Sequence, residues 1–447
     1  MRRDTGPSAR TSSRWVMASW PSAIHGSGEG RPPERRTARC VAPYDGSLAP
    51  ARRHPPGNCR MTCRTLSATV LMLLAAPLLA APATTPAAAP VEARVPFAPS
   101  VFTGSDGARH LAYELHVSNF YGDTGSLFPE DLQVFADGDA QPLLNLDAKG
   151  LSAWTRPAPA DGTPVTVAAG KRAVIYLWLT LPPGAAVPTT LRHHIDFRND
   201  HQQRFALEGA VIATQPTVPP VLGPPLRGGR WLAHEGPGAA QSHHWGSLVA
   251  VNGALTIPQR FALDLVGVDA QGRAVHAAPE RLQHTRHQDW VGYAAPVIAV
   301  ADGVVRDARD GEPEHAPLTA QPEPASLTAA GLFGNYVVLE IAPGVFASYA
   351  HLRKGSIKVR PGQTVQRGQA LAELGQSGNS AAPHLHFQLS NSVHFEGSEG
   401  IPYVFDRFQY YGPESEAQLF GQGPAWNSPS PQPRRQQLPL NDVVIGF

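Results

Sequence analysis

Cysteine is almost absent from this 447-residue chain, and the three that occur, Cys40, Cys59 and Cys63, lie within the first 63 residues. The rest of the chain therefore has no disulfide and no thiolate metal ligand, and any metal there must be held by histidine and carboxylate groups. Charged residues are also scarce, at 16%. The 45 prolines and 42 glycines indicate many turns, and hence a β-rich fold rather than long helices.

Long apolar runs are lacking as well. The most apolar stretch, from about Val70 to Ala80, is too short to span a membrane as a helix. It follows Arg64 and precedes Ala81-Pro82-Ala83, a small-residue cleavage motif, so residues 61–83 are predicted to be a secretory signal peptide. We therefore expect an exported protein, in the periplasm or outside the cell, with no membrane span after cleavage. An uncleaved N-terminal anchor is the alternative.

Residues 1–60 are rich in Arg, Pro, Gly and Ser and show no periodic apolar pattern. A signal peptide rarely begins 60 residues into a chain, so we expect Met61 to be the true start and residues 1–60 not to be translated. A disordered basic arm is the alternative. Residues 1–83 contain 12 basic and 4 acidic residues, which leaves 25 basic and 32 acidic residues and a net charge of −7. This acidic balance argues against a nucleic-acid partner.

The remaining chain divides by pattern into two β-rich domains. Residues 92–215 contain short alternating runs such as HLAYELHVSNF and RAVIYLWLTL, separated by turn residues, which predict an Ig-like β-sandwich. A proline-rich linker follows at 214–229, and residues 230–412 are again strand-rich. Residues 413–447 are predicted to be a Pro/Gln-rich tail, and the fold class is all-β. The sequence predicts no oligomeric state.

Two histidines, His384 and His386, stand at alternate positions of the apolar run PHLHFQLS. In a strand, alternate side chains share one face, so both imidazoles should point the same way while Leu385 and Phe387 point into a core. A pair of solvated polar residues would explain this pattern. A metal site, with one histidine as ligand and its neighbour acting on a water molecule, would explain it equally well.

Five ordered blocks favour the metal site: YAAPVIAVADGVV, GNYVVLEI, SYAHL, VRPGQTVQRGQALAELGQSGNS and PHLHFQL. They resemble the core of the LytM-type zinc metallopeptidases of family M23, which cut peptide cross-bridges in bacterial cell walls. The resemblance covers residues 292–390 and, in part, 255–270, about a quarter of the chain. It implies a LytM-type antiparallel β-sheet domain at 230–412. The upstream β-module resembles a secreted bacterial subgroup of the family.

The resemblance also implies roles for individual residues. His386 would be a zinc ligand, and Asp264, in IPQRFALDLVG, would be another. His384 and His351, the latter in SYAHL, would be the acid/base pair that flanks the attacking water. Zinc lowers the pKa of such a water toward ~7 and keeps one coordination position open for it. A neutral histidine can take the water's proton and later return it to the leaving amine.

One position departs from the family pattern. Four residues before Asp264, where the family has its first histidine ligand, this chain has Arg260, which has no lone pair for a metal. By strand alternation Arg260 should face the same side as Asp264 and could form an ion pair with it. Alternatively, Arg260 could bind a substrate carboxylate or the oxyanion, beside a two-ligand metal.

Other histidines could supply the missing ligand. The candidates are His243 and His244 in QSHHWGS, and His284 and His287 in LQHTRHQDW. We choose His244, because it lies about 20 residues before Asp264, the span of a hairpin.

The favoured function is a secreted, zinc-dependent endopeptidase that hydrolyses peptidoglycan stems or cross-bridges, with one Zn²⁺ per chain and peptidoglycan peptides as partners. The alternative is a catalytically inactive LytM-type module that binds cell wall or regulates another hydrolase. Arg260 favours the alternative, whereas the retained Asp264 and three histidines favour the enzyme. A protease of other secreted proteins is a third, less favoured reading.

Overall fold

A computed structural model describes residues 86–160, 162–239, 242–319, 328–427 and 430–447. The predicted extension 1–60 and signal peptide 61–83 lie outside these residues. No helix of the described part is long and apolar enough to cross a membrane. Strands dominate it, and its helices have seven residues or fewer, so the prediction of an all-β fold is confirmed.

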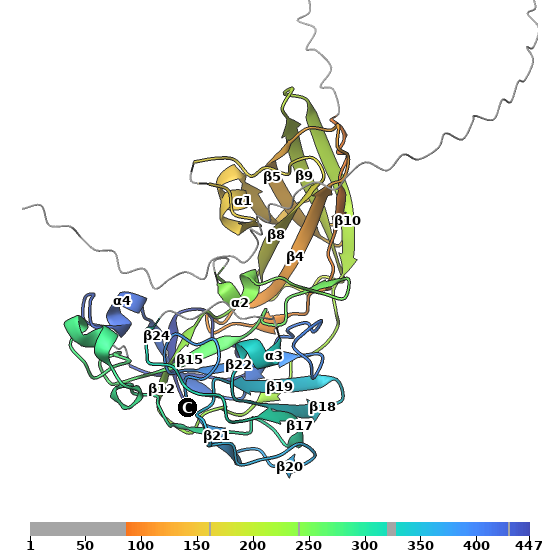
Figure 1. The fold of residues 1–447 in the computed structure, drawn as a ribbon. Helices are drawn as coiled ribbons and strands as arrows, with labels where there is room; N and C mark the ends of the chain where they lie inside the picture. Colours follow the sequence, from red (N-terminus) through yellow and green to blue (C-terminus); the bar gives the residue numbers. More distant parts are fainter. Residues whose placement is uncertain (1–85, 161, 240–241, 320–327, 428–429) are drawn as a thin grey trace, which may run out of the picture. The chain divides into compact units, whose positions relative to one another are not determined.

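The first domain consists of two sheets (Figure 1). One sheet has the order β1 (Ala87–Ala88), β10 (Arg204–Ala213), β9 (Thr190–Asn199), β5 (Leu127–Ala136) and β6 (Pro142–Asp147). The other has the order β2 (Glu92–Arg94), β4 (Arg109–Asn119), β8 (Lys171–Leu181) and β7 (Thr155–Arg156), with β3 (Phe102–Thr103) also paired to β4. The short helix α1 (Ala148–Trp154) is capped by Asp147. Two sheets enclosing one apolar core form a β-sandwich.

Both faces of the sheet that contains β4 and β8 are buried, and each face packs against a different core. Leu111, Leu115 and Ile175 belong to the core inside the sandwich. Ala112 and Tyr176, which point the other way by strand alternation, belong to the core of the second domain. The β-sandwich is therefore packed against the second domain by one whole sheet face, within the compact unit Pro86–Phe447.

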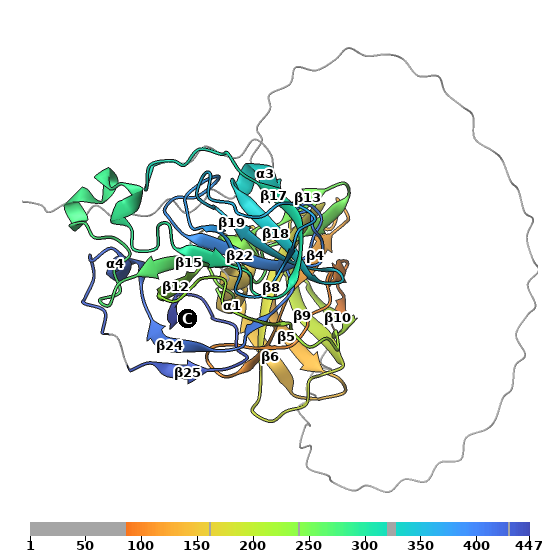
Figure 2. The same ribbon diagram turned by 90° about the horizontal axis from the view of Figure 1, so that it is seen from below.

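The second domain is built on a ten-stranded antiparallel sheet (Figures 1 and 2). Its order is β20 (Thr364–Val365), β17 (Gly303–Arg309), β18 (Tyr336–Ala342), β19 (Val345–Ala350), β22 (Leu385–Ser390), β15 (Leu263–Val268), β12 (Arg230–His234), β26 (Val443–Gly446), β24 (Phe408–Pro413) and β25 (Gln432–Arg434). The central strands β15, β19 and β22 come from three separate parts of the sequence. Residues distant in the chain are thereby placed side by side at the middle of the sheet.

Smaller elements surround this sheet. Three two-stranded pairs are formed by β11 (Val221–Leu222) with β23 (Val404–Phe405), β13 (Val249–Val251) with β14 (Ala254–Thr256), and β16 (Pro296–Ile298) with β21 (Ala370–Glu373). The helices are α2 (His243–Gly246), α3 (Ala329–Leu332) and α4 (Glu416–Leu419), with 3₁₀ turns at Pro279–His284 and His287–Asp289.

The segment 413–447, described from its composition as a tail, contributes two strands to the large sheet. Strand β26 lies between β12 and β24, and Val444 and Ile445 are fully buried. Asp442 lies just before β26. Its Oδ1 is 2.7 Å from His234 Nδ1, which is the distance of a hydrogen bond or an ion pair. The end of the chain is thus part of the sheet that carries the candidate site.

Candidate metal centre

Strands β15 and β22 bring Asp264 and His386 together. The two strands are antiparallel, and Asp264 lies directly opposite His386 in their register. Leu263 and Leu385 point into the apolar core, so the polar residues between them point to the other face. Asp264 Oδ1 lies 3.0 Å from His386 Nδ1. The alternation predicted for the PHLHFQLS run is therefore present.

His351 and His384 are placed by the ends of neighbouring strands. His351 follows β19 directly and has a positive φ of 59°, an uncommon conformation for a residue with a side chain. His384 precedes β22 and forms a β-bridge with Gly375. The two imidazole rings lie 4.7 Å apart between centroids, and both residues are less than 10% exposed. His384 Nε2 lies 3.4 Å from Asp264 Oδ1.

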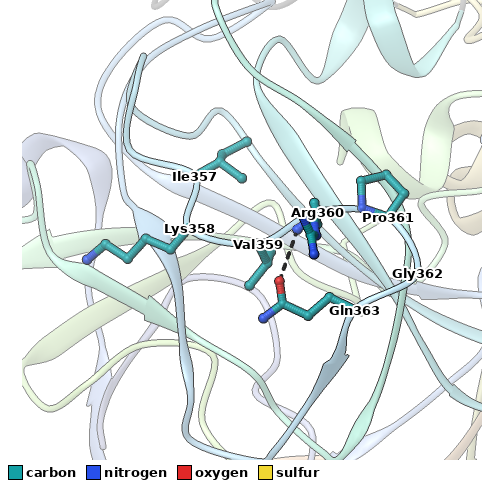
Figure 3. A pocket seen from close by; sticks show the side chains of 7 residues that line it. All are labelled: Ile357, Lys358, Val359, Arg360, Pro361, Gly362 and Gln363. Atoms are coloured by element: carbon teal, nitrogen blue, oxygen red, sulfur yellow. Dashed lines mark hydrogen bonds between the residues drawn. The ribbon is translucent and has the colours of Figure 1, made fainter.

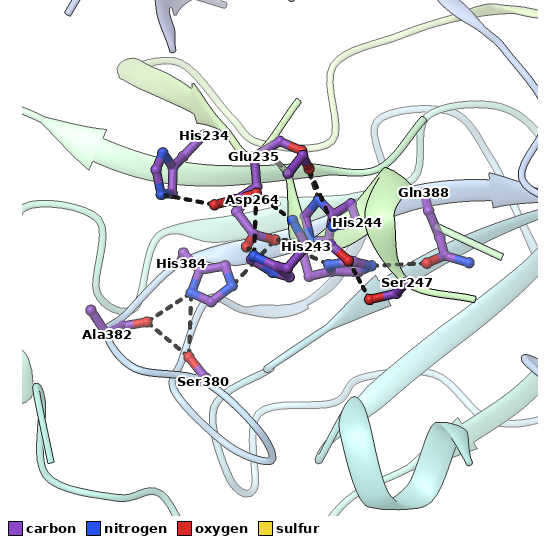
Figure 4. Close-up of polar contacts among 12 residues, drawn as sticks. His234, Glu235, His243, His244, Ser247, Asp264, Ser380, Ala382, His384 and Gln388 are labelled. Carbon is purple, nitrogen blue, oxygen red and sulfur yellow. Dashed lines mark hydrogen bonds and ion pairs between the residues drawn. The ribbon is translucent and has the colours of Figure 1, made fainter. Parts of the chain in front are cut away.

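Helix α2, which is not part of the large sheet, brings His244 close to the same carboxylate. Ser242 caps this short helix by accepting a hydrogen bond from the backbone N–H of His244. His244 Nε2 lies 3.3 Å from Asp264 Oδ1, and the side chain is 2% exposed. The more exposed His243 has its Nε2 3.9 Å from Asp264 Oδ2. We call Asp264, His244, His384 and His386 the Asp264 cluster (Figure 4).

The protonated nitrogen of His386 can be assigned from its neighbours. Gln388 donates through Nε2 to the backbone carbonyl of Pro258 at 3.2 Å, which turns its Oε1 toward His386. That oxygen can only accept, so the proton of the neutral imidazole lies on His386 Nε2, 2.9 Å away. His386 Nδ1 therefore presents a lone pair to Asp264.

The same reasoning applies to His244 and His384. The carbonyl of Glu235 lies 3.0 Å from His244 Nδ1, and the carbonyl of Ala382 lies 2.8 Å from His384 Nδ1. Each carbonyl accepts the proton of a neutral ring, which leaves Nε2 as a lone pair. His384 Nε2 is buried and has no hydrogen-bond partner among the described residues. Three imidazole nitrogens thus converge on one carboxylate oxygen.

The pKa values of these groups depend on one another. Burial lowers the pKa of His244 to about 4, so the ring is neutral at physiological pH. Burial acts to raise the pKa of Asp264, but His244 and His384 outweigh it and hold this pKa well below its usual value. Burial likewise opposes protonation of His384, but the Asp264 carboxylate raises its pKa overall.

The spacing of the donor atoms suits a divalent metal. Zinc holds imidazole nitrogen and carboxylate oxygen at about 2.1 Å in tetrahedral geometry, which separates neighbouring ligand atoms by about 3.4 Å. The three nitrogens lie 3.0, 3.3 and 3.4 Å from Asp264 Oδ1. His243, His244 and Asp264 also offer ligand atoms within 4.8 Å of one another. Nitrogen and carboxylate ligands without sulfur are what a cysteine-free domain can offer.

Arg260 does not lie beside Asp264, and the expected ion pair between them is wrong. Strand β15 begins only at Leu263, and the preceding residues form a turn in which the N–H of Arg260 bonds to the carbonyl of Ile257. Arg260 is 3% exposed and pairs with Glu114 and Glu399, at 2.7 Å each. Strand alternation does not extend through a turn, so Arg260 points away from the cluster and cannot contact a substrate there.

The other candidate ligands, His284 and His287, do not belong to the Asp264 cluster. His287 stacks on Tyr293, and its Nε2 lies 2.6 Å from the carbonyl of His315. His284, in the neighbouring 3₁₀ turn, belongs to no ligand-sized group in the described part of the chain. Two supporting residues gave no sequence signal, namely Glu235, which binds His243 and His244, and Gln388. Their roles arise from backbone and amide contacts that only the fold creates.

The charge of Glu235 completes the surroundings of α2. Burial acts to raise its pKa, but the hydrogen bond and charge of His243 dominate and hold the pKa at about 2. Its Oε2 accepts the backbone N–H of His243 at 2.8 Å. Glu235 therefore fixes the start of α2 as an ionised carboxylate.

A surface pocket lies in another part of the second domain. It is lined by residues 357–363 of a turn between β19 and β20 (Figure 3). Arg360 and Gln363 form a hydrogen bond within it. It contains none of the histidines described above, so we assign no chemistry to it.

Residues 289–397 match peptidase family M23. The chain therefore contains a domain of this family, as its motif blocks indicated. The matched range includes His351, His384 and His386, and it begins after Asp264. Asp264 and His244 thus lie outside the matched range.

The chain is similar to a peptidoglycan DD-endopeptidase, ShyC of Vibrio cholerae, with 27% identity over 124 residues, 27% of this chain and 24% of that protein. It is 36% identical over 115 residues to an uncharacterized metalloprotease of Haemophilus influenzae, covering 26% of this chain and 20% of the relative. The chain thus spans about a quarter of these relatives or less.

Among solved structures, a putative M23 peptidase of Pseudomonas aeruginosa aligns with 68% of this chain and 96% of its own, at 14% identity and a TM-score of 0.23.

Proposed function

We propose that this protein is an exported, zinc-dependent endopeptidase that hydrolyses peptide bonds of peptidoglycan. One observation carries the proposal: imidazole nitrogens of His244, His384 and His386 lie 3.0–3.4 Å from one oxygen of the buried Asp264 carboxylate, and each ring has an acceptor at its other nitrogen. Burying such a carboxylate without a cation costs several kcal/mol, on the order of 3–5. The M23 match and the endopeptidase names of the relatives support the reaction class.

Zinc would be held by Asp264, His386 and His244. His386 Nδ1, on β22, and His244 Nε2, on α2, lie 3.0 and 3.3 Å from Asp264 Oδ1, on β15. When bound, zinc supplies Lewis-acid polarisation of the scissile carbonyl and lowers the pKa of the attacking water. Gln388 and Glu235 keep the metal-facing nitrogens deprotonated by accepting hydrogen bonds from the opposite side of each ring.

His351 and His384 would move the protons. His351 Nδ1 is held by the carbonyl of Ser377 at 2.9 Å, so its neutral ring also has a free Nε2. Burial and the neighbouring His384 lower the pKa of His351 well below its usual value, so the ring is neutral. The two rings lie 4.7 Å apart between centroids, so a proton taken from water on one side can be delivered to a leaving amine on the other.

The arginine in place of a family histidine no longer counts against activity. Its charge is neutralised by Glu114 and Glu399, away from Asp264. His244, from a different segment, occupies the position beside Asp264 that a third ligand requires. In this proposal Asp264, His386 and His244 would be the three protein ligands, and His351 and His384 the acid/base pair.

A direct test is digestion of purified peptidoglycan by the full chain, with the released fragments separated by chromatography and identified by mass spectrometry. We expect cross-linked fragments to be converted to uncross-linked ones, with loss of this activity on zinc removal and recovery on zinc addition. His384→Ala should bind zinc and release nothing. A zinc-loaded wild-type protein that leaves peptidoglycan intact but sediments with it would establish the binding-module alternative instead.

A further inference from the structure

Helix α2 has two buried side chains that serve different parts of the protein. His244 points to Asp264, whereas the next residue, Trp245, packs in the core of the second domain against the outward face of β8. Trp245 is 1% exposed, although it lies on a helix of only four residues. A helix this short has no stability of its own, so its position depends on the contacts of its side chains.

The contacts of Trp245 are made mainly by the β-sandwich. Its ring lies 5.5–5.9 Å, between centroids, from those of Trp154, Tyr176 and Trp178. The hydroxyl of Tyr176 donates to the carbonyl of Gly246, the last residue of α2, at 3.4 Å. In Figure 1, α2 lies beside the end of β4. The segment that carries His244 is thus attached to the first domain.

Glu114 of β4 connects this attachment to the turn that precedes Asp264. Its Oε1 accepts the indole N–H of Trp245 and also the Nε–H of Arg260 at 2.9 Å. Its Oε2 accepts the Nη2–H of Arg260 at 2.7 Å, so the guanidinium is bound in bidentate fashion. One buried carboxylate of the β-sandwich therefore holds both α2 and the segment leading into β15.

Arg260 extends the connection to a third segment. Its Nη1 donates to Glu399 Oε2 at 2.7 Å and to the carbonyl of Gly400 at 3.2 Å. Glu399 Oε2 also accepts the backbone N–H of Ile257 at 3.3 Å. We call Arg260, Glu114 and Glu399 the Arg260 cluster. It joins three segments of the chain, namely β4, the turn before β15 and the loop after β22.

We propose that Glu114, acting through Trp245, is a positioning residue for the metal ligand His244, so that the β-sandwich is a structural part of the metal centre. The inference rests on the proposed function, because it assumes that His244 binds metal. It follows from the geometry that loss of the Glu114–Trp245 contact releases α2 and moves His244 Nε2 away from Asp264. Removal of a group that orients a metal ligand typically weakens metal binding by about 10–100-fold.

The test uses the full chain with Glu114→Gln, Trp245→Phe and the matched control Glu130→Gln. Glu130 is a carboxylate of the same β-sandwich that pairs with Arg198 at 2.6 Å and has no described contact with α2. The zinc dissociation constant is measured by competition with a chromophoric chelator, and the visible spectrum of the Co²⁺ form reports the number and type of ligands. Thermal unfolding is recorded in parallel.

We expect Trp245→Phe, which lacks the indole N–H, to bind zinc about 10–100-fold more weakly and to change the Co²⁺ spectrum, and Glu114→Gln, whose amide oxygen can still accept that N–H, to show a smaller change of the same kind, while Glu130→Gln leaves both unchanged. Variants that unfold at a lower temperature but retain the wild-type dissociation constant and spectrum would overturn the inference. Trp245→Phe retains an aromatic ring and serves as the test should Glu114→Gln fail to fold. A wild-type chain that binds neither Zn²⁺ nor Co²⁺ would refute the proposed function itself.

Discussion

Arg260 and Asp264 are four residues apart, and both are buried charges, but their surroundings differ in kind. The guanidinium of Arg260 is bound by two carboxylates. Within the described part of the chain it donates four hydrogen bonds, three to carboxylate oxygens and one to a backbone carbonyl. Asp264 has no arginine or lysine within ion-pair distance in the described part of the chain and faces imidazole nitrogens instead. The Arg260 cluster contains charges of both signs from the protein's own groups, whereas the Asp264 cluster is, in our proposal, completed by a metal ion.

This difference separates a structural ion cluster from a ligand site. A buried charge with well-placed opposite charges and hydrogen bonds holds segments together. A buried carboxylate ringed by neutral acceptors is unstable alone and gains most from binding a metal. Two positions four residues apart therefore have different surroundings, and in the proposed function His244 supplies from another segment the ligand that the family resemblance places at position 260.

The largest effect is expected from removing a ligand of the Asp264 cluster. His244→Ala or His386→Ala should abolish stoichiometric zinc binding and lower the rate of peptidoglycan hydrolysis by about 10³-fold or more, because a bound metal lowers the activation barrier by several kcal/mol. Elemental mass spectrometry and fragment release check both effects. His243→Ala is the matched control and should retain zinc, since its Nε2 lies 3.9 Å from Asp264. Zinc loss in His243→Ala alone would reassign the ligand.

Removing a proton-transfer group should separate binding from turnover. His351→Ala and His384→Ala are expected to retain one zinc per chain while kcat falls by about 10²–10⁴-fold, the usual contribution of an acid or base. Zinc content and steady-state kinetics on the same preparations measure the two quantities. If either variant loses its zinc together with its activity, that histidine belongs among the ligands.

Breaking the Arg260 cluster should cost stability rather than abolish metal binding. Arg260→Met leaves two buried carboxylates without a counter-charge and should lower the free energy of unfolding by about 3–5 kcal/mol. Denaturant unfolding measures this, and zinc at saturating concentration should still bind at one per chain. In addition, Arg260→His should not restore zinc binding to His244→Ala, because position 260 points away from Asp264. Restored binding would show that the turn can reorient.

A smaller effect is expected at Gln388. Gln388→Leu removes the acceptor that holds the proton on His386 Nε2, so zinc affinity should fall by about 10–100-fold with little change in folding. Competition titration measures the affinity. Gln409→Leu, at an exposed glutamine on β24, is the control. An unchanged dissociation constant for Gln388→Leu would mean that the ring of His386 is oriented by other contacts.

Sequence periodicity predicted what depends on local pattern. The alternation of apolar and polar residues in β15 and β22 places Asp264 and His386 on the face opposite the core, and the structure has them there. The all-β class likewise follows from the density of short alternating runs. The residue roles came from the family resemblance, and the assignment of acid and base remains a prediction.

What the sequence could not predict depends on tertiary contacts. The expectation for Arg260 extended strand alternation into a turn that begins at Pro258, where alternation does not hold. The ion-pair partner of Arg260, Glu114, lies 146 residues away in the other domain. The partners of Val443–Gly446 in the sheet are set by long-range register, so the strand could not be placed from its composition. His244 was chosen by its distance along the chain alone, and its supporting contact with Glu235 had no signal.

The central claim is that the Asp264 cluster binds a metal through ligands of this chain. It is tested most directly by the amount of zinc per mole of purified full chain, measured by elemental mass spectrometry after dialysis without chelator. We predict about one zinc per chain in the wild type and none in Asp264→Asn. A wild-type chain that holds no zinc, even after excess metal has been added and dialysed away, would contradict the account.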